Sequence, residues 1–174
     1  LGGGSADAAF ALKMLNELFE LQLEAMQLEE YAAQLGSDCP FFISNKPVLV
    51  GGRGEVFRPT SLSLEGWYLV LIYPDLHIPT KEAYQGITPE IPPKTCEEVL
   101  ALPIEQWKGR LINDFEARLF PKYPILPKLK QDFYDKGAVY ASMTGSGSTV
   151  FGLFRERPDW EEWGWKGQVH GCSL

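Results

Sequence analysis

The chain is poor in the residues that build metal centres and disulfide frameworks. Its 174 residues include three cysteines and two histidines. Cys39, Cys96 and Cys172 are widely spaced with no CxxC pair, and His77 and His170 lie far apart in the sequence. An odd number of scattered cysteines is typical of a reducing compartment rather than of a disulfide scaffold. The sequence therefore predicts a cytoplasmic protein without a transition-metal site.

Long apolar runs and excess positive charge are missing as well. No run approaches the roughly 20 apolar residues that a membrane span needs, and no signal peptide is visible. The formal net charge is −7 at pH 7, whereas a nucleic-acid surface needs clustered Lys and Arg. We therefore expect no nucleic-acid partner and no membrane partner, and either a monomer or a homodimer.

Apolar periodicity and turn residues predict alternating helices and strands, and hence an α+β fold. Helices are expected over 5–19, 24–35, 96–101, 104–118 and 126–136, and strands over 47–50, 67–73, 138–143, 149–154 and 168–173. We expect Phe41 to begin an extended segment and Pro79–Pro93 to form a loop. A change of composition around Pro59–Gly66 predicts two domains, residues 1–62 and 63–174.

The chain opens on a glycine-rich segment that runs directly into the first predicted helix, Leu1-Gly2-Gly3-Gly4-Ser5-Ala6. The N–H groups of a helix's first turn lack intrahelical partners, and glycine lets an anion approach them closely. This pattern favours a phosphate-binding site. The alternative is a flexible leader whose helix is capped by the side chain of Ser5 or Asp7.

Two further segments could carry chemistry. Thr144–Thr149 places two glycines among hydroxyl residues between strands, which suits either an anion cradle or a plain hairpin turn; no Lys follows, so it is not a Walker loop. Asp38 follows a helix end and precedes Cys39-Pro40. Its carboxylate is either a turn-former or a group that accepts a proton from a substrate hydroxyl.

The order LGGGSADAA, GSDCPFF, GRGE and TGSGSTVFGLF resembles the GHMP kinase superfamily over the whole chain. Within that family, Ile78–Tyr84 and Asn113–Glu116 are similar to the branch that phosphorylates the tertiary 2-hydroxyl of a diphosphocytidyl derivative of methylerythritol, in non-mevalonate isoprenoid synthesis. The resemblance implies an N-terminal domain like the second domain of ribosomal protein S5, of which only the second half is present, and a ferredoxin-like C-terminal domain.

The resemblance also implies roles for individual residues. ATP and Mg²⁺ would be the cofactors, with Ser5 as a magnesium contact and Asp38 as the catalytic carboxylate. The implied ATP-binding residues are Leu1, Gly2, Gly3, Gly4, Ser5 and Ala6, and the implied substrate-binding residues are Thr80, Tyr84, Gly145, Ser146 and Gly147. We interpret Asn113 and Glu116 as structural polar residues, and the C-terminal tryptophans as packing residues.

Two alternatives stay open. The chain could serve another acceptor of the same family, such as homoserine, mevalonate or a sugar, or it could be a non-catalytic binding protein on the same fold. The family's Lys from near the N-terminus has no counterpart here, because the chain begins inside its own glycine motif. We therefore expect an upstream segment to be absent and these 174 residues alone to be inactive.

Overall fold

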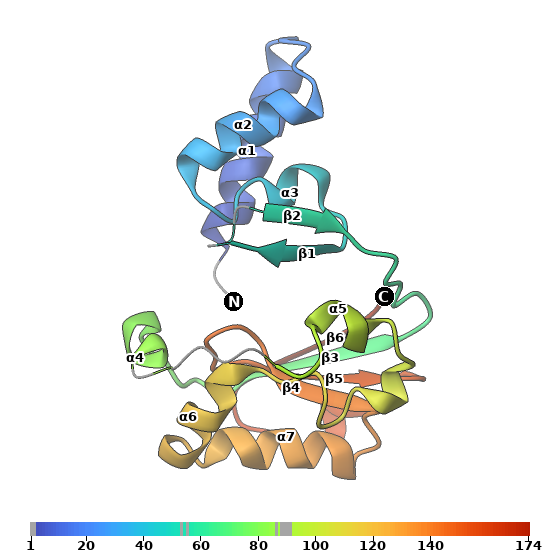
Figure 1. The fold of residues 1–174 in the computed structure, drawn as a ribbon. Coiled ribbons are helices and arrows are strands. Elements are labelled where there is room, and N and C mark those ends of the chain that lie inside the picture. The colour runs from blue at the N-terminus through green and yellow to red at the C-terminus, as the bar shows by residue number, and fades with distance from the viewer. Residues whose placement is uncertain (1–2, 53, 55, 86, 88–91) are drawn as a thin grey trace. The chain divides into compact units, whose positions relative to one another are not determined.

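The structure, a computed structural model, describes residues 3–52, 54, 56–85, 87 and 92–174. It divides into two compact units, Leu1–Ser63 and Leu64–Leu174 (Figure 1). Each unit has an apolar core of its own.

The first unit is a layer of helices followed by a two-stranded hairpin. Its elements are α1 (Gly4–Leu18), α2 (Ala25–Leu35), α3 (Phe41–Ser44), β1 (Val48–Gly51) and β2 (Val56–Pro59). The two strands pair in antiparallel register, with Val48 opposite Pro59. The three helices enclose a small core made of Ala9, Leu28, Ala32, Cys39 and Ile43.

Local capping explains the length of α2. Glu24 and Gln27 form a capping box at its N-terminus, and the Gly36 N–H group closes its C-terminus on the Ala32 carbonyl at 3.2 Å. The predicted helices over 5–19 and 24–35 are confirmed, and Cys39, 3% exposed, fills the core between them.

The prediction that Phe41 begins an extended segment is wrong, because residues Phe41–Ser44 form α3. Pro40 supplies the helical φ of −58° just before the helix, and Asn45 ends it in the left-handed region at φ 49°. The helical turn directs Ile43 into the core of the unit, where it is 6% exposed. Burial of Ile43 outweighs the strand preference of two adjacent phenylalanines.

The second unit is a four-stranded antiparallel sheet with helices packed on it. Its strands, in the spatial order β4-β5-β3-β6, are β3 (Tyr68–Tyr73), β4 (Tyr140–Met143), β5 (Val150–Phe154) and β6 (Gln168–Ser173). Its helices are α4 (Thr80–Tyr84), α5 (Cys96–Leu100), η1 (Ile104–Gln106), α6 (Asp114–Lys122), α7 (Ile125–Asp135) and η2 (Trp160–Glu162). α6 and α7 lie on one face of the sheet (Figure 1).

The core of this unit lies between α7 and the sheet. Phe133 of α7 is completely buried and packs edge-on against Trp165, with ring centroids 4.7 Å apart. Trp163 lies 4.7 Å from Trp165 and 5.7 Å from Phe154. The prediction that the tryptophans pack rather than bind is confirmed by these contacts.

The predicted helix over 104–118 is wrong in its middle. The chain makes one 3₁₀ turn at Ile104–Gln106 and then leaves the helical region, since Gly109 has φ +74°. A new helix, α6, starts after Asn113, whose side chain accepts a hydrogen bond from the Phe115 N–H group at 3.0 Å. The expected loop over Pro79–Pro93 likewise contains the short helix α4.

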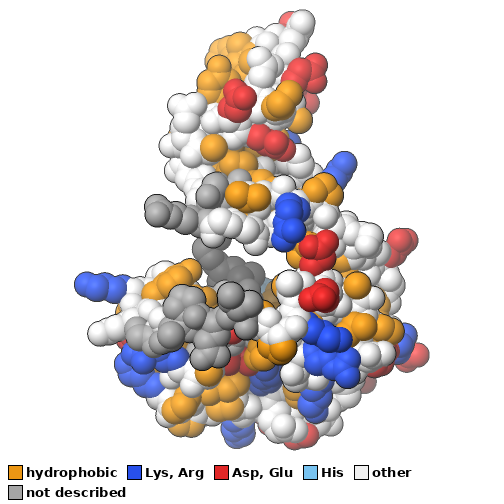
Figure 2. All heavy atoms as spheres, viewed as in Figure 1, with side chains coloured by type: hydrophobic (Ala, Val, Ile, Leu, Met, Phe, Trp, Pro, Cys, Tyr) orange, Lys and Arg blue, Asp and Glu red, His pale blue; other side chains and the backbone are white. Residues whose placement is uncertain are grey.

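Several large apolar side chains of α1 and α2 are exposed, among them Phe10, Met14, Leu18 and Met26. Apolar atoms and carboxylates share the surface of this unit on the face drawn in Figure 2. Among the described residues, no helix is both long enough and apolar enough to cross a bilayer.

We predict that Gly152→Ala destabilises the second unit by about 1–3 kcal/mol through overpacking. A Cβ atom at Gly152 would lie 2.4 Å from Cδ1 of Phe133. The Phe133 ring is fully buried and packs against Trp165, so it cannot easily move away. Urea unfolding followed by tryptophan fluorescence measures this, because all five tryptophans belong to this unit. Adding Phe133→Leu opens the space, so the double variant should lose less unfolding free energy than the sum of the losses in the two single variants. A loss equal to that sum would contradict the packing argument.

Candidate functional site

The N-terminus of α1 presents backbone donors that have no acceptor within the helix. The first intrahelical bond runs from the Asp7 N–H group to the Gly3 carbonyl at 2.9 Å, so the N–H groups of Gly4, Ser5 and Ala6 have no acceptor within the helix. Among the described residues, a Cβ atom at Gly4 would meet nothing within 4 Å, so the surface beside Gly4 has room for a ligand. Leu1 and Gly2 lie outside the described residues. A helix end of this kind attracts an anion through its dipole.

The alternative that Ser5 or Asp7 caps this helix with its side chain is wrong. The helix already begins at Gly4 with Gly3 as its N-cap, so both residues lie within the first turns. Asp7 is the acidic residue of the first turn, a position where a carboxylate favours the helix dipole. Its Oδ2 atom would lie 3.7 Å from a Cβ at Gly3, so a phosphate here would need a cation to offset that charge.

Asp38 lies in the turn between α2 and α3 with its side chain exposed. Ser37 Oγ donates a hydrogen bond to its Oδ1 atom at 3.1 Å. Its neighbour Cys39 is buried in the same small core as Ala9 of α1, which anchors the turn against that helix. The carboxylate is thus accessible on a backbone that the core holds in place.

The β1–β2 hairpin comes close to this carboxylate. A Cβ atom at Gly54 would lie 3.8 Å from Asp38 Oδ1, and Gly54 has φ +113°, a conformation that L side chains rarely adopt. Gly54, the second glycine of the GRGE segment, therefore leaves room beside Asp38. Lys13 does not turn toward it, since its Nζ atom donates to the Ile43 carbonyl at 3.2 Å.

In the second unit, the glycine loop is the segment Thr144–Thr149 between β4 and β5. Thr144 N–H donates to the Thr149 carbonyl at 2.9 Å and Gly147 N–H to the Thr144 carbonyl at 3.0 Å. Gly145 and Gly147 both have positive φ, at +53° and +87°. Glycine suits position 147 because L side chains rarely adopt its φ, and a Cβ there would also lie 2.8 Å from Met143 Sδ.

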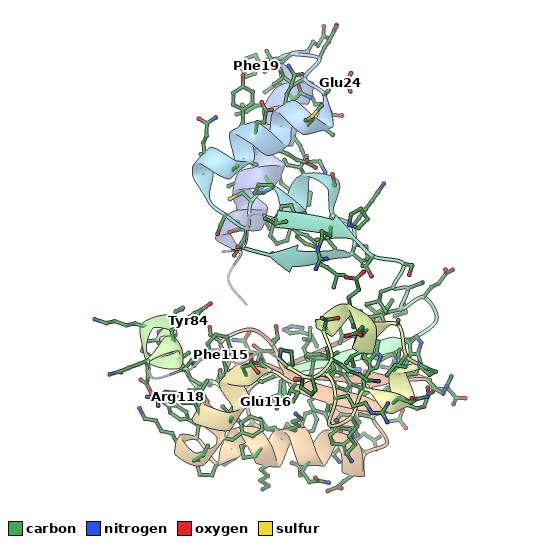
Figure 3. All side chains as sticks on the ribbon, in the orientation of Figure 1. Phe19, Glu24, Tyr84, Phe115, Glu116 and Arg118 are labelled. Atoms are coloured by element: carbon green, nitrogen blue, oxygen red, sulfur yellow. The ribbon has the colours of Figure 1, made fainter. Side chains whose placement is uncertain are left out.

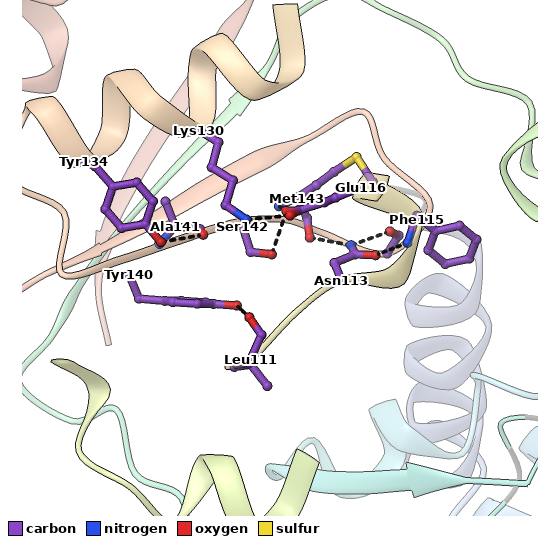
Figure 4. A network of polar contacts seen from close by, with 11 residues as sticks. Leu111, Asn113, Phe115, Glu116, Lys130, Tyr134, Tyr140, Ala141, Ser142 and Met143 are labelled. Atoms are coloured by element: carbon purple, nitrogen blue, oxygen red, sulfur yellow. Dashed lines mark hydrogen bonds and ion pairs between the residues drawn. The ribbon is translucent and has the colours of Figure 1, made fainter. Parts of the chain in front are cut away.

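Asn113 holds the glycine loop from the start of α6. Its Nδ2 atom donates to the Met143 carbonyl at 2.7 Å and to the Gly145 carbonyl at 2.8 Å, while its Oδ1 atom caps α6 (Figure 4). Tyr140 fixes the preceding segment, because its hydroxyl donates to the Leu111 carbonyl at 2.9 Å. Burial raises the pKa of Tyr140 to about 12, which keeps this donor protonated.

Glu116, three residues after Asn113 in the first turn of α6, holds the same loop from the strand side. Its carboxylate is 5% exposed and accepts the Met143 N–H group at 2.8 Å and the Ser142 hydroxyl at 3.0 Å. Lys130 of α7 approaches its second oxygen at 2.5 Å (Figure 4). Asn113 and Glu116 thus make the structural contacts expected of them, and the structure adds what they position: the end of β4 and the loop that follows it.

The structure brings the predicted residue Tyr84 next to the start of α6. The Tyr84 ring, 63% exposed, packs edge-on against Phe115 with centroids 4.9 Å apart (Figure 3). Thr80, at the other end of α4, is also exposed. A Cβ at Gly147 would lie 3.4 Å from Ile78 Cδ1, so the segment leading into α4 borders the glycine loop.

Sequence reasoning missed two contributors to this surface. Phe115 enters the sequence analysis only as part of a motif, although its place two residues after the cap residue Asn113 puts it in the first turn of α6. Ser148 is 3% exposed and donates to the Leu76 carbonyl, which ties the glycine loop to the segment before α4. Among the described residues, no three His, Cys, Asp or Glu side chains cluster as metal ligands.

Comparison with known proteins places these features in a family. The model of the GHMP kinases N terminal domain matches residues 1–46, and the model of the GHMP kinases C terminal matches residues 103–162. The chain belongs to the GHMP kinase family. The first match includes the N-terminus of α1 and Asp38, and the second includes Asn113, Glu116 and the glycine loop.

Two curated proteins similar to this chain carry the same name. The 4-diphosphocytidyl-2-C-methyl-D-erythritol kinase of Bacteroides fragilis is 53% identical over 154 residues, which cover 88% of this chain and 56% of that protein. The kinase of that name from Parabacteroides distasonis is 45% identical over 176 residues, covering 97% and 65%. The chain thus spans between about half and two thirds of the length of these relatives.

A crystal structure of 4-(cytidine 5'-diphospho)-2C-methyl-D-erythritol kinase has the same fold. It superposes with a TM-score of 0.75 at 30% identity, covering 98% of this chain and 64% of that one. The predicted α+β GHMP kinase fold is therefore confirmed.

We predict that Asn113→Ala destabilises the second unit by about 2–3 kcal/mol, from a lost helix cap and two loop carbonyls that lose their donor. Asn113→Ser keeps an oxygen at the cap but is too short to reach Met143 and Gly145, so it should recover about 1 kcal/mol of that loss. Urea unfolding followed by tryptophan fluorescence measures both variants. Equal stability of Asn113→Ala and the unsubstituted protein would contradict the role of this side chain.

Proposed function

We propose that the protein containing this chain is an ATP-dependent kinase that phosphorylates the 2-hydroxyl of 4-diphosphocytidyl-2-C-methyl-D-erythritol. The observation that carries the proposal is the 53% identity with the Bacteroides fragilis kinase of that name, over 154 residues that draw on both units. In this assignment residues 1–62 are the second half of the ATP-binding domain and residues 63–174 are the C-terminal domain.

The start of α1 is the proposed site for the phosphates of ATP. The N–H groups of Gly4, Ser5 and Ala6 supply donors without an intrahelical acceptor, and the helix dipole adds partial positive charge. The Ser5 hydroxyl and the nearby Asp7 carboxylate are oxygen ligands of the kind that Mg²⁺ takes. When bound, Mg²⁺ would offset the negative charge that the phosphates and Asp7 bring together.

Asp38 is the proposed catalytic carboxylate. Its exposed oxygens can accept the proton of the acceptor hydroxyl and orient that hydroxyl toward the γ-phosphate. The acceptor is a tertiary alcohol, which is sterically hindered, so orientation matters as much as proton removal. The Ser37 hydroxyl donates a hydrogen bond to the carboxylate, and the lack of a side chain at Gly54 leaves room beside it.

The second unit is the proposed binding surface for the diphosphocytidyl group. Thr80 and the exposed ring of Tyr84 lie on α4, and the loop with Gly145, Ser146 and Gly147 lies beside the segment that leads into α4. A cytosine stacked on an aromatic ring gains about 1–3 kcal/mol. The loop N–H groups can donate to the phosphates.

A panel of acceptors tests the proposal. The complete protein is given ATP and magnesium with diphosphocytidyl-methylerythritol, mevalonate, homoserine or galactose, and ADP release is measured. Turnover with the cytidyl acceptor alone is the expected result. Turnover with another acceptor instead would overturn the proposed substrate but keep a kinase, and no turnover with any of them from a folded protein would favour the non-catalytic binding protein.

We predict that Asp38→Asn in the complete protein lowers kcat at least about 100-fold, because it removes a positioned proton acceptor while keeping the shape of the side chain. Glu30→Gln, which removes an exposed carboxylate on α2 of the same unit, is the matched control and should leave kcat unchanged. Circular dichroism checks that both variants fold. A near-normal kcat for Asp38→Asn would remove this residue from the catalytic role.

A further inference from the structure

The helix that carries Tyr84 is too short to hold itself in place. α4 has five residues, Thr80–Tyr84, and no side chain caps its N-terminus. A helix of this length is unstable in water without tertiary contacts. The position of Tyr84 therefore depends on what fastens α4 to the rest of the unit.

Glu82 fastens α4 to the C-terminal end of α6. Its carboxylate forms an ion pair with Lys122, the last residue of α6, and accepts a hydrogen bond from the Tyr123 hydroxyl at 2.6 Å. The ion pair with Lys122 and the hydrogen bond from Tyr123 lower the pKa of Glu82, so the carboxylate stays charged at neutral pH. The same interaction raises the pKa of Lys122.

Tyr84 provides the second attachment, at the opposite end of α6. Its ring packs on Phe115 in the first turn of α6, while Lys122 closes the last turn, about 10 Å along the helix axis. Between the two attachments, Ala83 is completely buried in the core. Attachment at two ends of one helix fixes both the place of α4 along α6 and its rotation.

We infer that Glu82 is a positioning residue for the Tyr84 ring, and that through this ring it sets the affinity for the cytosine of the substrate; the inference rests on the proposed function. The side chain of Glu82 does not need to touch the substrate, because it acts on the orientation of the helix. An aromatic platform stabilises a base only when its face is correctly presented, so a loosened α4 weakens binding without altering the reacting groups.

A surface ion pair elsewhere in the unit shows what distinguishes Glu82. Glu105 pairs with Arg155, with side chains 44% and 66% exposed, and neither residue lies on α4. The Glu82 side chain is 26% exposed and has two partners. Removal of either glutamate breaks one ion pair, but only removal of Glu82 releases the element that carries Tyr84.

The test compares Glu82→Ala with Glu105→Ala in the complete protein. We expect Glu82→Ala to raise KM for the cytidyl substrate by roughly three- to tenfold, with kcat and the KM for ATP nearly unchanged. Glu105→Ala should change none of these constants. Glu82→Gln keeps an oxygen that accepts the Tyr123 hydroxyl, so it should fall between Glu82→Ala and the unsubstituted protein.

Binding of cytidine 5'-diphosphate, followed by calorimetry without ATP, gives a readout that does not need turnover. The dissociation constant should rise by the same factor as KM in Glu82→Ala. If the unsubstituted protein turns over the cytidyl substrate and Glu82→Ala behaves like Glu105→Ala, only this inference is overturned. If the unsubstituted protein neither turns over that substrate nor binds the diphosphate, the proposed function fails and this inference fails with it.

Discussion

The second unit depends on the first turn of α6. Side chains at this turn satisfy the N–H groups of the helix's own N-terminus and also the backbone groups of the end of β4 and the glycine loop. Asn113 caps the helix with its oxygen and holds the carbonyls of Met143 and Gly145 with its nitrogen. Glu116, in the same first turn, accepts the N–H group of Met143. An amide side chain is suited to the first position because it is both donor and acceptor at a single site.

Phe115, between Asn113 and Glu116, extends this arrangement to α4. Phe115 follows the cap by two positions and its ring meets Tyr84. The glycine loop and the aromatic surface of α4 are therefore positioned by neighbouring residues of one rigid turn. A displacement of α6 would move both surfaces together, which links loop geometry to base recognition in the proposed function.

The sequence allowed the prediction of those elements whose signals are local. Gly36 and Gly137 mark helix ends, and the apolar run before Pro74 marks a buried strand, because each signal acts within a few residues. Gly109 gives no comparable signal, since a single glycine in an amphipathic pattern is often tolerated within a helix. The strand-like Phe41 segment became helical because of Pro40 and the burial of Ile43, which is a tertiary effect.

The candidate site divides in the same way. Asp38 and the glycines can be proposed from sequence, because turn chemistry and close backbone approach leave a compositional signal. The role of Glu82 leaves none: its partners, Lys122 and Tyr123, lie 40 and 41 residues away, and only the fold shows that they meet. In the proposed function, a proton acceptor at Asp38 would serve any alcohol acceptor, whereas the contacts of α4 would suit only an acceptor with an aromatic base. On the proposed function, the choice of acceptor therefore depends on contacts far apart in the sequence, and changes in α4 or its attachments would alter specificity before they altered the chemistry.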